Sequence, residues 1–180
     1  MGQQEQGVFA SDERYKTVPR TLCFVLHGDD VLLLKGAPDK RLWANRYNGV
    51  GGHVERGEDV CTAARREICE ETGWCDDELE DLRLRGIINV DAGSPQTGIA
   101  LFVFTAKARK RQTSASAEGT LEWIPLSRLL DYALVEDLPI LLARILELAD
   151  DAPPLFGHYS YDESDKLVMR FNACHLPDAA

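Results

Sequence analysis

Three closely spaced glutamates are the residues of this chain best suited to hold a metal ion. Glu67, Glu70 and Glu71 fall at positions i, i+3 and i+4 of a segment whose pattern predicts a helix, so their carboxylates share one face. Like charges at this spacing destabilise a helix, and a bound cation removes the repulsion. Carboxylate oxygens are hard ligands that suit Mg²⁺, with Mn²⁺ as the alternative. An ordinary charged amphipathic helix is the competing interpretation.

A glycine-rich segment precedes the predicted helix. Gly51 and Gly52 allow the backbone to approach closely and can offer a carbonyl oxygen to the same metal ion. Magnesium commonly combines a few carboxylates with substrate phosphates, so the segment suits a metal–pyrophosphate complex. Arg66 is next to Glu67 in the sequence, and we expect the two side chains to face different ways. We expect Arg66 to reach Glu58 instead and to pin the loop to the helix.

The complete spacing over residues 52–74 is far more specific than the glutamates alone. The segment fits G-x5-E-x7-R-E-U-x-E-E-x-G-U, with U an apolar residue, at every position. Seven fixed residues match by chance with a probability on the order of 10⁻⁹ per starting position. In this segment the chain resembles the Nudix hydrolase family. The resemblance implies an α+β fold, an α/β/α sandwich with a mixed sheet between helices, and hydrolysis of a nucleoside diphosphate linked to another moiety.

The resemblance also implies roles for the residues of the box. Its metal-binding glutamates correspond to Glu67, Glu70 and Glu71, assisted by the carbonyl of Gly51 or Gly52. Its remaining charged pair, Arg66 and Glu58, joins the loop to the helix. The implied cofactor is Mg²⁺ or Mn²⁺.

The flanking residues indicate a substrate. Residues 46–52, RYNGVGG, resemble a segment of the MutT-like subgroup that acts on oxidised purine nucleoside triphosphates. The resemblance gives Asn48 a base-binding role, and an amide offers both a donor and an acceptor to a guanine edge. A buried turn asparagine is the alternative interpretation of Asn48.

Two adjacent acids, Glu136 and Asp137, open the second predicted helix at the place where this subgroup carries base-binding acids. A capping aspartate with an acidic neighbour is the alternative. The subgroup also carries a base-stacking tryptophan two or three residues before these acids. Here the corresponding residues are Leu134 and Val135, so this chain departs from the pattern at the base.

Three further residues are candidates for contact with metal or phosphate. Glu118 stands five residues before Trp123, as a metal-associated glutamate does in the subgroup, although an exposed loop acid is the alternative. Lys35 and Arg46 flank the glycine-rich segment, and we expect them to contact phosphates. The basic cluster at 107–111 is interpreted as a solvated loop, with guidance of a triphosphate as the alternative.

Periodicity and turn residues predict the elements that position these groups. A helix is expected at 59–72, stopped by Gly73, and a second at 137–149. The acidic segment 76–81 is expected to be a solvated linker. Strands are expected at 21–27, 31–35, 47–54, 82–90, 99–108, 121–124, 156–161 and 167–171.

Length and composition bound the remaining possibilities. The 180 residues suit one domain, expected at 14–174 between a disordered tail at 1–13 and a tail at 175–180. The net charge of −10 argues against a nucleic acid polymer as partner. No apolar run is long enough to span a membrane, and no secretory signal is seen, so a cytoplasmic location is expected. The five cysteines are expected to be mostly buried, reduced thiols.

These observations predict a metal-dependent enzyme that converts a nucleoside triphosphate, such as 8-oxo-dGTP, to the monophosphate and pyrophosphate. Glu67 and Glu118 are the candidates for general base. Hydrolysis of ADP-ribose, a nucleotide sugar or a dinucleoside polyphosphate is the first alternative. A nucleotide-sensing module without turnover is the second. The partner is a small nucleotide, and the sequence fixes no oligomeric state.

Overall fold

A computed structural model describes residues 14–113, 116 and 118–172 of the chain. The expected tails at 1–13 and 175–180 lie outside these residues. The eight strands are β1 (Lys16–His27), β2 (Asp30–Gly36), β3 (Tyr47–Asn48), β4 (Leu79–Val90), β5 (Thr97–Ala108), β6 (Gly119–Pro125), β7 (Leu155–Tyr161) and β8 (Leu167–Asn172). The helices are α1 (Val60–Thr72) and α2 (Leu138–Glu147), with short 3₁₀ helices η2 (Asp76–Glu78) and η3 (Leu126–Asp131).

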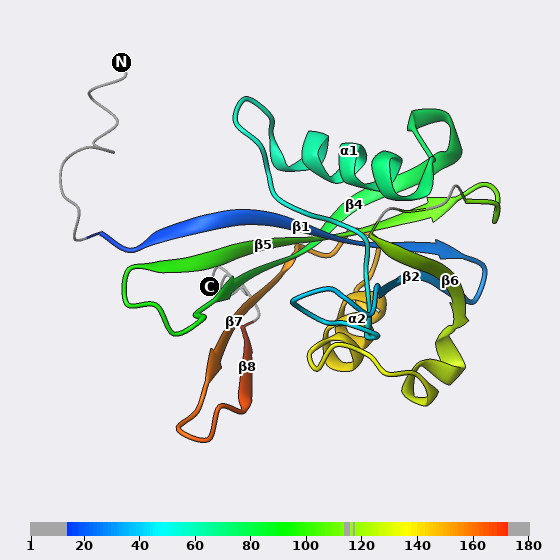
Figure 1. Cartoon of the computed structure of the whole chain (residues 1–180). Helices are drawn as coiled ribbons and strands as arrows, with labels where there is room; N and C mark the ends of the chain where they lie inside the picture. The colour runs from blue at the N-terminus through cyan, green and yellow to red at the C-terminus, as the bar shows by residue number, and fades with distance from the viewer. Residues whose placement is uncertain (1–13, 114–115, 117, 173–180) are drawn as a thin grey trace, which may run out of the picture.

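All eight strands form one mixed sheet, and the two α-helices lie on opposite sides of it (Figure 1). The order is β3-β2-β1-β5-β4-β7-β8, and β6 pairs with β2 beside this path. The β1–β5 and β4–β7 pairs are parallel, while the other strand pairs are antiparallel. The predicted α+β sandwich is confirmed.

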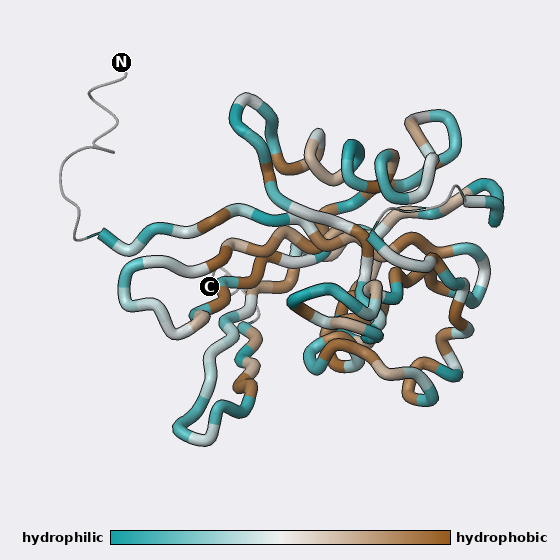
Figure 2. The backbone as a smooth tube through the Cα atoms, viewed as in Figure 1, coloured by the Kyte–Doolittle hydropathy of each residue, from teal (hydrophilic) through white to brown (hydrophobic). Residues whose placement is uncertain are grey.

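Alternation along the central strands divides the core into two layers. Leu22 and Phe24 of β1 pack with the apolar face of α2. Cys23 and Val25, which alternate with these two residues along β1, pack with α1. Successive side chains of a strand point to opposite faces, so one strand supplies both layers. Figure 2 shows the hydrophobic residues running through the central strands and α2, with hydrophilic residues at the loop tips.

Local capping fixes the ends of α1. The Asp59 carboxylate accepts hydrogen bonds from the N–H groups of Cys61 and Thr62 at 2.8 and 3.0 Å. Gly73 ends the helix in a left-handed conformation, with φ of 76°. The strand expected at 47–54 is much shorter than predicted, because the chain pairs with β2 only over Tyr47–Asn48 and then meets β1 in single bridges at Val50 and His53.

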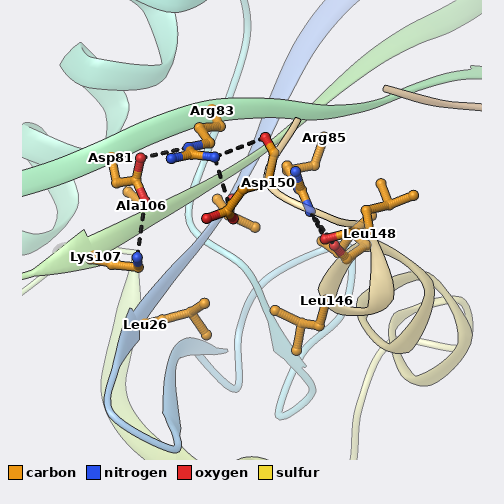
Figure 3. A pocket seen from close by; sticks show the side chains of 11 residues that line it. Leu26, Asp81, Arg83, Arg85, Ala106, Lys107, Leu146, Leu148 and Asp150 are labelled. Atoms are coloured by element: carbon orange, nitrogen blue, oxygen red, sulfur yellow. Dashed lines mark hydrogen bonds and ion pairs between the residues drawn. The ribbon is translucent and has the colours of Figure 1, made fainter. Parts of the chain in front are cut away.

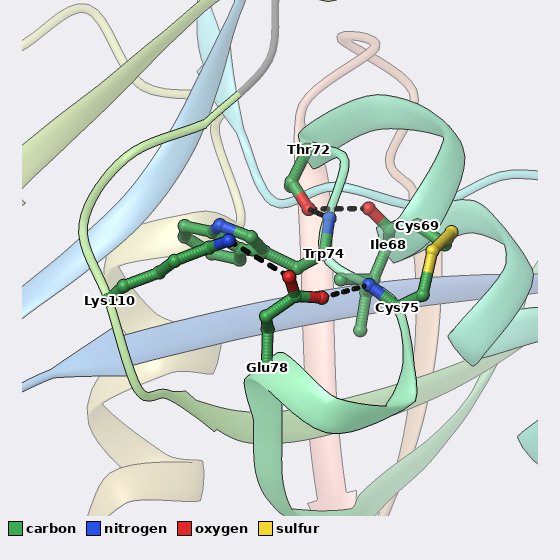
Figure 4. The surroundings of a disulfide bond; sticks show 7 residues. All are labelled: Ile68, Cys69, Thr72, Trp74, Cys75, Glu78 and Lys110. Atoms are coloured by element: carbon green, nitrogen blue, oxygen red, sulfur yellow. Dashed lines mark hydrogen bonds and ion pairs between the residues drawn. A yellow bond between two sulfur atoms is a disulfide. The ribbon is translucent and has the colours of Figure 1, made fainter.

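The cysteine prediction is wrong for three of the four cysteines that the structure describes, and Cys174 lies outside the described residues. Cys69, in the last turn of α1, forms a disulfide with Cys75, and their Cα atoms lie 4.7 Å apart (Figure 4). The left-handed turn at Gly73 reverses the chain and brings the two residues together. Cys61 is exposed and Cys23 is buried, both as free thiols.

The acidic segment expected to be a linker is ordered instead. It forms η2 and the start of β4, opposite the basic cluster at the end of β5. The acidic segment and the basic cluster, which were expected to be separate solvated segments, face each other, because antiparallel pairing brings their opposite charges together. The ion pairs are Glu78–Lys110, Glu80–Arg109 and Asp81–Lys107.

Buried Arg85 closes the C-terminal end of α2 (Figure 3). Its guanidinium donates to the carbonyl oxygens of Ile145, Leu148 and Ala149. The last carbonyls of a helix have no partner within the helix, and a cation there also suits the helix dipole. Arg85 therefore holds α2 against β4.

We expect Arg85→Met to lower the free energy of unfolding by about 3 kcal/mol, because buried carbonyls lose a charged donor. Arg83→Met is the matched control. Arg83 is partly exposed and pairs with Asp81, so its loss should cost less than about 1 kcal/mol. Urea unfolding measures both values, and equal losses would contradict the role assigned to Arg85.

Candidate active site

The glycine-rich segment lies directly against β1. The Thr21 N–H donates to the Gly52 carbonyl at 2.8 Å, and the Cys23 N–H donates to the Val50 carbonyl at 2.7 Å. A Cβ atom on Gly51 would lie 2.3 Å from the Thr21 carbonyl oxygen. A Cβ atom on Gly52 would lie 2.5 Å from a carboxylate oxygen of Glu67. At position 51 the close atoms are backbone and φ is +146°, so only glycine permits this approach of the loop to the strand, whereas at position 52 the flexible end of Glu67 can move aside.

The Arg66 guanidinium joins this loop to α1. It donates to both carboxylate oxygens of Glu58, at 2.8 and 3.2 Å, and to the His53 carbonyl at 2.9 Å. The expected Arg66–Glu58 pair is therefore present. Arg66 also lowers the pKa of Glu58 by donating to its carboxylate.

The expectation that Arg66 faces away from Glu67 is wrong. Nη1 of Arg66 lies 2.8 Å from Glu67 Oε1 and 3.3 Å from Glu70 Oε2. The arginine side chain is long and its guanidinium has five donors, so one end reaches the loop while the other contacts glutamates of the helix. Arg66 therefore compensates part of the negative charge that the sequence concentrates on α1.

Glu71 is the deepest of the three glutamates, and its side chain is only partly satisfied. It is 5% exposed, and Oε1 accepts from the Gly51 N–H at 3.4 Å. Its other oxygen, Oε2, is buried without a hydrogen-bond partner. Burial raises the pKa of Glu71 to about 8, and the charges of Glu118 and Glu67 add to the shift. A buried, unpartnered carboxylate oxygen is a site that a cation would stabilise.

Two acids whose charges act on Glu71 form ion pairs with basic side chains, Glu67 with Arg66 and Glu118 with Lys40. Burial raises the pKa of Glu67, and the charges of Glu70 and Glu118 contribute. Glu118 accepts a 2.7 Å ion pair from Lys40. Within the described residues, no three acidic, His or Cys side chains converge closely enough to enclose a metal ion.

The donor set nevertheless fits a hard divalent ion. It consists of carboxylate oxygens beside backbone carbonyls, and Mg²⁺ and Mn²⁺ prefer such oxygen ligands. One of the carboxylate oxygens, Oε2 of Glu71, is buried and has no hydrogen-bond partner. Such an ion would compete with Arg66 for Glu67 and Glu70, and with Lys40 for Glu118.

The base-binding candidates lie on two segments that meet through their backbones. The Tyr47 N–H donates to the Ala133 carbonyl at 2.9 Å, and the Val135 N–H donates to the Tyr47 carbonyl at 3.0 Å. This places Asn48 beside the segment that leads to Asp137. The Asn48 amide oxygen accepts from the Gly49 N–H at 2.9 Å, and the structure records no contact between the Asn48 and Asp137 side chains.

The two expected phosphate contacts are engaged with this same region. Arg46 donates through Nη1 to the Leu134 carbonyl at 3.1 Å. The Lys35 ammonium lies 5.4 Å from the centre of the Tyr47 ring. Both residues thus support β3 and the segment beside it, and their contact with phosphate stays a prediction.

Asp137 opens α2 but does not cap it. Its side chain makes no capping hydrogen bond, so the structure does not support the capping interpretation. Burial raises the pKa of Asp137, and the charge of Glu136 adds to the shift. A carboxyl group in this setting retains its proton more readily and can donate a hydrogen bond.

The sequence did not indicate a buried tyrosine whose pKa is affected by the charge of Asp137. Tyr159 of β7 is buried, and its hydroxyl has no hydrogen-bond partner. Burial raises the pKa of Tyr159 above its usual range, and the charge of Asp137 contributes. No local signal marked this residue, because the order β4-β7-β8 brings it to the site only in the folded sheet.

Comparison with known proteins agrees with this arrangement. Residues 16–145 match the NUDIX domain model. The chain belongs to the Nudix family. It is a Nudix hydrolase by this match and by its relatives. An oxidized purine nucleoside triphosphate hydrolase of Mus musculus is 29% identical over 153 residues, covering 82% of this chain and 89% of the relative. The corresponding Danio rerio protein is 29% identical over 109 residues, covering 61% and 67%.

Solved structures share the fold of this Nudix hydrolase. The mutator MutT protein of Bacillus halodurans aligns with a TM-score of 0.69 and 26% identity, covering 86% of this chain and 97% of the other. The NUDIX domain of Shewanella oneidensis NrtR, solved with ADP ribose, aligns with a TM-score of 0.65 and 14% identity, covering 82% and 98%. At that lower identity the likeness concerns the fold.

The raised pKa of Asp137, the partly buried acid at the start of α2, can be tested. Since the pKa of Asp137 is raised on folding, protonation stabilises the folded protein, and this stabilisation is lost as the pH rises through the folded pKa. Asp137→Asn lacks this titration. We expect the unfolding free energy of this variant to rise relative to that of the wild type as the pH increases from about 4, the ordinary pKa of an aspartate, toward neutral pH.

Urea unfolding across this range measures the difference. Glu163→Gln, an exposed acid in the turn between β7 and β8, is the control. A constant difference between Asp137→Asn and the wild type at every pH would show that folding does not change the pKa of Asp137.

Proposed function

We propose that this Nudix hydrolase converts a nucleoside triphosphate to the monophosphate and pyrophosphate, with an oxidised purine such as 8-oxo-dGTP as substrate. The observation that carries the proposal is the unpartnered, buried oxygen of Glu71 against the glycine-rich loop. Glu67 and Glu118 act on its pKa, so several acids share one region. The chemistry of these donors supports a Mg²⁺ or Mn²⁺ ion as cofactor.

The residues suggest how the reaction proceeds. Glu67, Glu70 and Glu71 would hold the divalent ion, which would supply positive charge to the phosphates and lower the pKa of water. The chain's part is to hold the triphosphate along the loop and to accept a proton at Glu67 or Glu118. The oxygen of the water bonds to the α phosphorus as the bond from that phosphorus to the oxygen bridging the α and β phosphates breaks. Pyrophosphate leaves with the bridging oxygen.

Two observations support a purine substrate. Asn48 and the uncapped Asp137 lie on segments joined by the Tyr47 backbone. Relatives that cover most of the chain are named for hydrolysis of oxidised purine nucleoside triphosphates. We therefore assign base contacts to Asn48, Glu136 and Asp137.

The partner is accordingly a small nucleotide, bound by one domain spanning residues 14–174. In the described chain, no helix has the length and apolarity to cross a membrane. A cytoplasmic location stays a prediction.

We expect turnover to require Mg²⁺ or Mn²⁺ and to stop in excess EDTA. Glu71→Gln keeps the shape of the side chain and removes its charge, so kcat should fall by at least ~100-fold, as expected for a lost metal ligand. Pyrophosphate release from 8-oxo-dGTP measures both effects. Glu80→Gln, in the ion pair with Arg109, is the control and should retain full activity. Undiminished turnover in EDTA would contradict the metal requirement.

The base contacts are tested by substrate comparison. Asn48→Ala and Asp137→Asn should each lower kcat/KM for 8-oxo-dGTP by about 5- to 150-fold, since a buried polar group loses its partner. Pyrimidine triphosphates should be affected much less. Equal losses for every nucleotide would assign the two residues to folding alone. Release of a sugar phosphate from a diphosphate-linked nucleotide, with no turnover of triphosphates, would favour the other Nudix reaction.

A further inference from the structure

The loop between β2 and β3, residues 37–46, presents an aromatic ring to solvent. Trp43 is 48% exposed, and its neighbour Leu42 is 59% exposed. The other two tryptophans are engaged in the fold. Trp74 is buried, and Trp123 donates its indole N–H to the Arg111 carbonyl at 2.9 Å. Trp43 is thus the tryptophan whose ring is available to a ligand.

The backbone of Trp43 is strained. Its φ is +57°, and Asn45 follows with a φ of +60°. Asparagine tolerates this left-handed conformation, but a bulky residue rarely adopts it. Residues held in such conformations cluster at functional sites, where the surrounding structure compensates the strain. A glycine at position 43 would serve the loop better if the ring had no role.

Hydrogen bonds fix the loop in this conformation. The Gly36 N–H donates to the Arg46 carbonyl, and the Asn45 N–H donates to the Gly36 carbonyl, both at 3.0 Å. The Arg46 N–H donates in turn to the Trp43 carbonyl at 3.0 Å. A Cβ atom on Gly36 would lie 2.7 Å from that carbonyl oxygen, so the base of the loop is tightly packed.

The same loop contacts both parts of the candidate active site. On the acidic side, Lys40 pairs with Glu118 at 2.7 Å, and the Ala37 N–H donates to the Glu118 carbonyl at 3.3 Å. On the base side, Arg46 donates to the Leu134 carbonyl, three residues before Asp137. Trp43 lies between these two anchors in the chain.

We infer that Trp43 is the platform on which the substrate base stacks, and that it determines the preference for a purine. This inference rests on the proposed function. The chain has buried Leu134 and Val135 before Glu136, so no aromatic ring is available there. An exposed indole offers a large flat surface to a base, and stacking on such a ring is a common source of nucleotide affinity.

The test compares ligands with and without a base. The probes are 8-oxo-dGMP and inorganic pyrophosphate, titrated by calorimetry in Mg²⁺ with the full-length protein. Trp43→Gly should weaken binding of 8-oxo-dGMP by roughly 5- to 150-fold, as for the loss of a stacked base, and leave pyrophosphate binding unchanged. Its melting temperature should rise, because glycine relieves the left-handed backbone. Trp43→Phe retains a ring and should bind 8-oxo-dGMP within a few-fold of the wild type.

Leu42→Ala is the matched control, since it shortens an equally exposed side chain of the same loop and should bind both probes as the wild type does. Unchanged binding of 8-oxo-dGMP by Trp43→Gly overturns the inference, as does an equal loss for pyrophosphate. If Trp43→Gly binds normally while the wild type hydrolyses 8-oxo-dGTP, the inference fails and the proposed function stands. If the wild type turns over no nucleoside triphosphate, the proposed function fails too.

Discussion

The guanidinium of Arg66 connects the parts of the active site. It bonds the carboxylate of Glu58 and the carbonyl of His53 in the loop, and it pairs with Glu67 and Glu70 on α1. Without it, the negative charges of the helix would lose their ion-pair partner, and the loop would keep the longer Gly51–Glu71 hydrogen bond to α1. One arginine thus fixes the loop and supplies charge balance. These are competing demands on a single side chain, because Glu67 and Glu70, which pair with Arg66, are also proposed ligands of the metal ion.

The mixed sheet explains why acidic and base-binding groups meet. The central strand β1 alternates its side chains between two cores, so α1 and α2 can each pack on a separate face. The glycine-rich segment crosses β1 and links the α1 side to β3. Pairing of β3 with residues 133–135 then brings in the start of α2. Helix α1 and the acids proposed to bind the base are therefore joined through backbone contacts.

The negative charge of the chain is unevenly compensated. The acidic segment at the start of β4 pairs with the basic cluster at the end of β5, so those cations are engaged at their own edge of the sheet. At the active site the compensating cations are Arg66 and Lys40. Their ion pairs involve the acids that are proposed to bind metal.

The sequence by itself determined whatever depends on neighbours a few positions apart. The spacing of the box, the Asp59 cap and the Gly73 stop specify α1 and its glutamates, because capping and helical periodicity are local. The pattern of apolar residues likewise predicted most strands and both helices. The family followed from these local features.

Only the tertiary structure decided which distant groups meet. The Lys40–Glu118 pair joins residues 78 positions apart. The order of the strands brings Tyr159 into the region of Asp137. The sequence gives no distance between such residues, since their approach depends on which strands pair. The disulfide was missed for a related reason. Its formation depends on the direction in which the chain leaves Gly73, and a left-handed turn brings Cys75 back against Cys69.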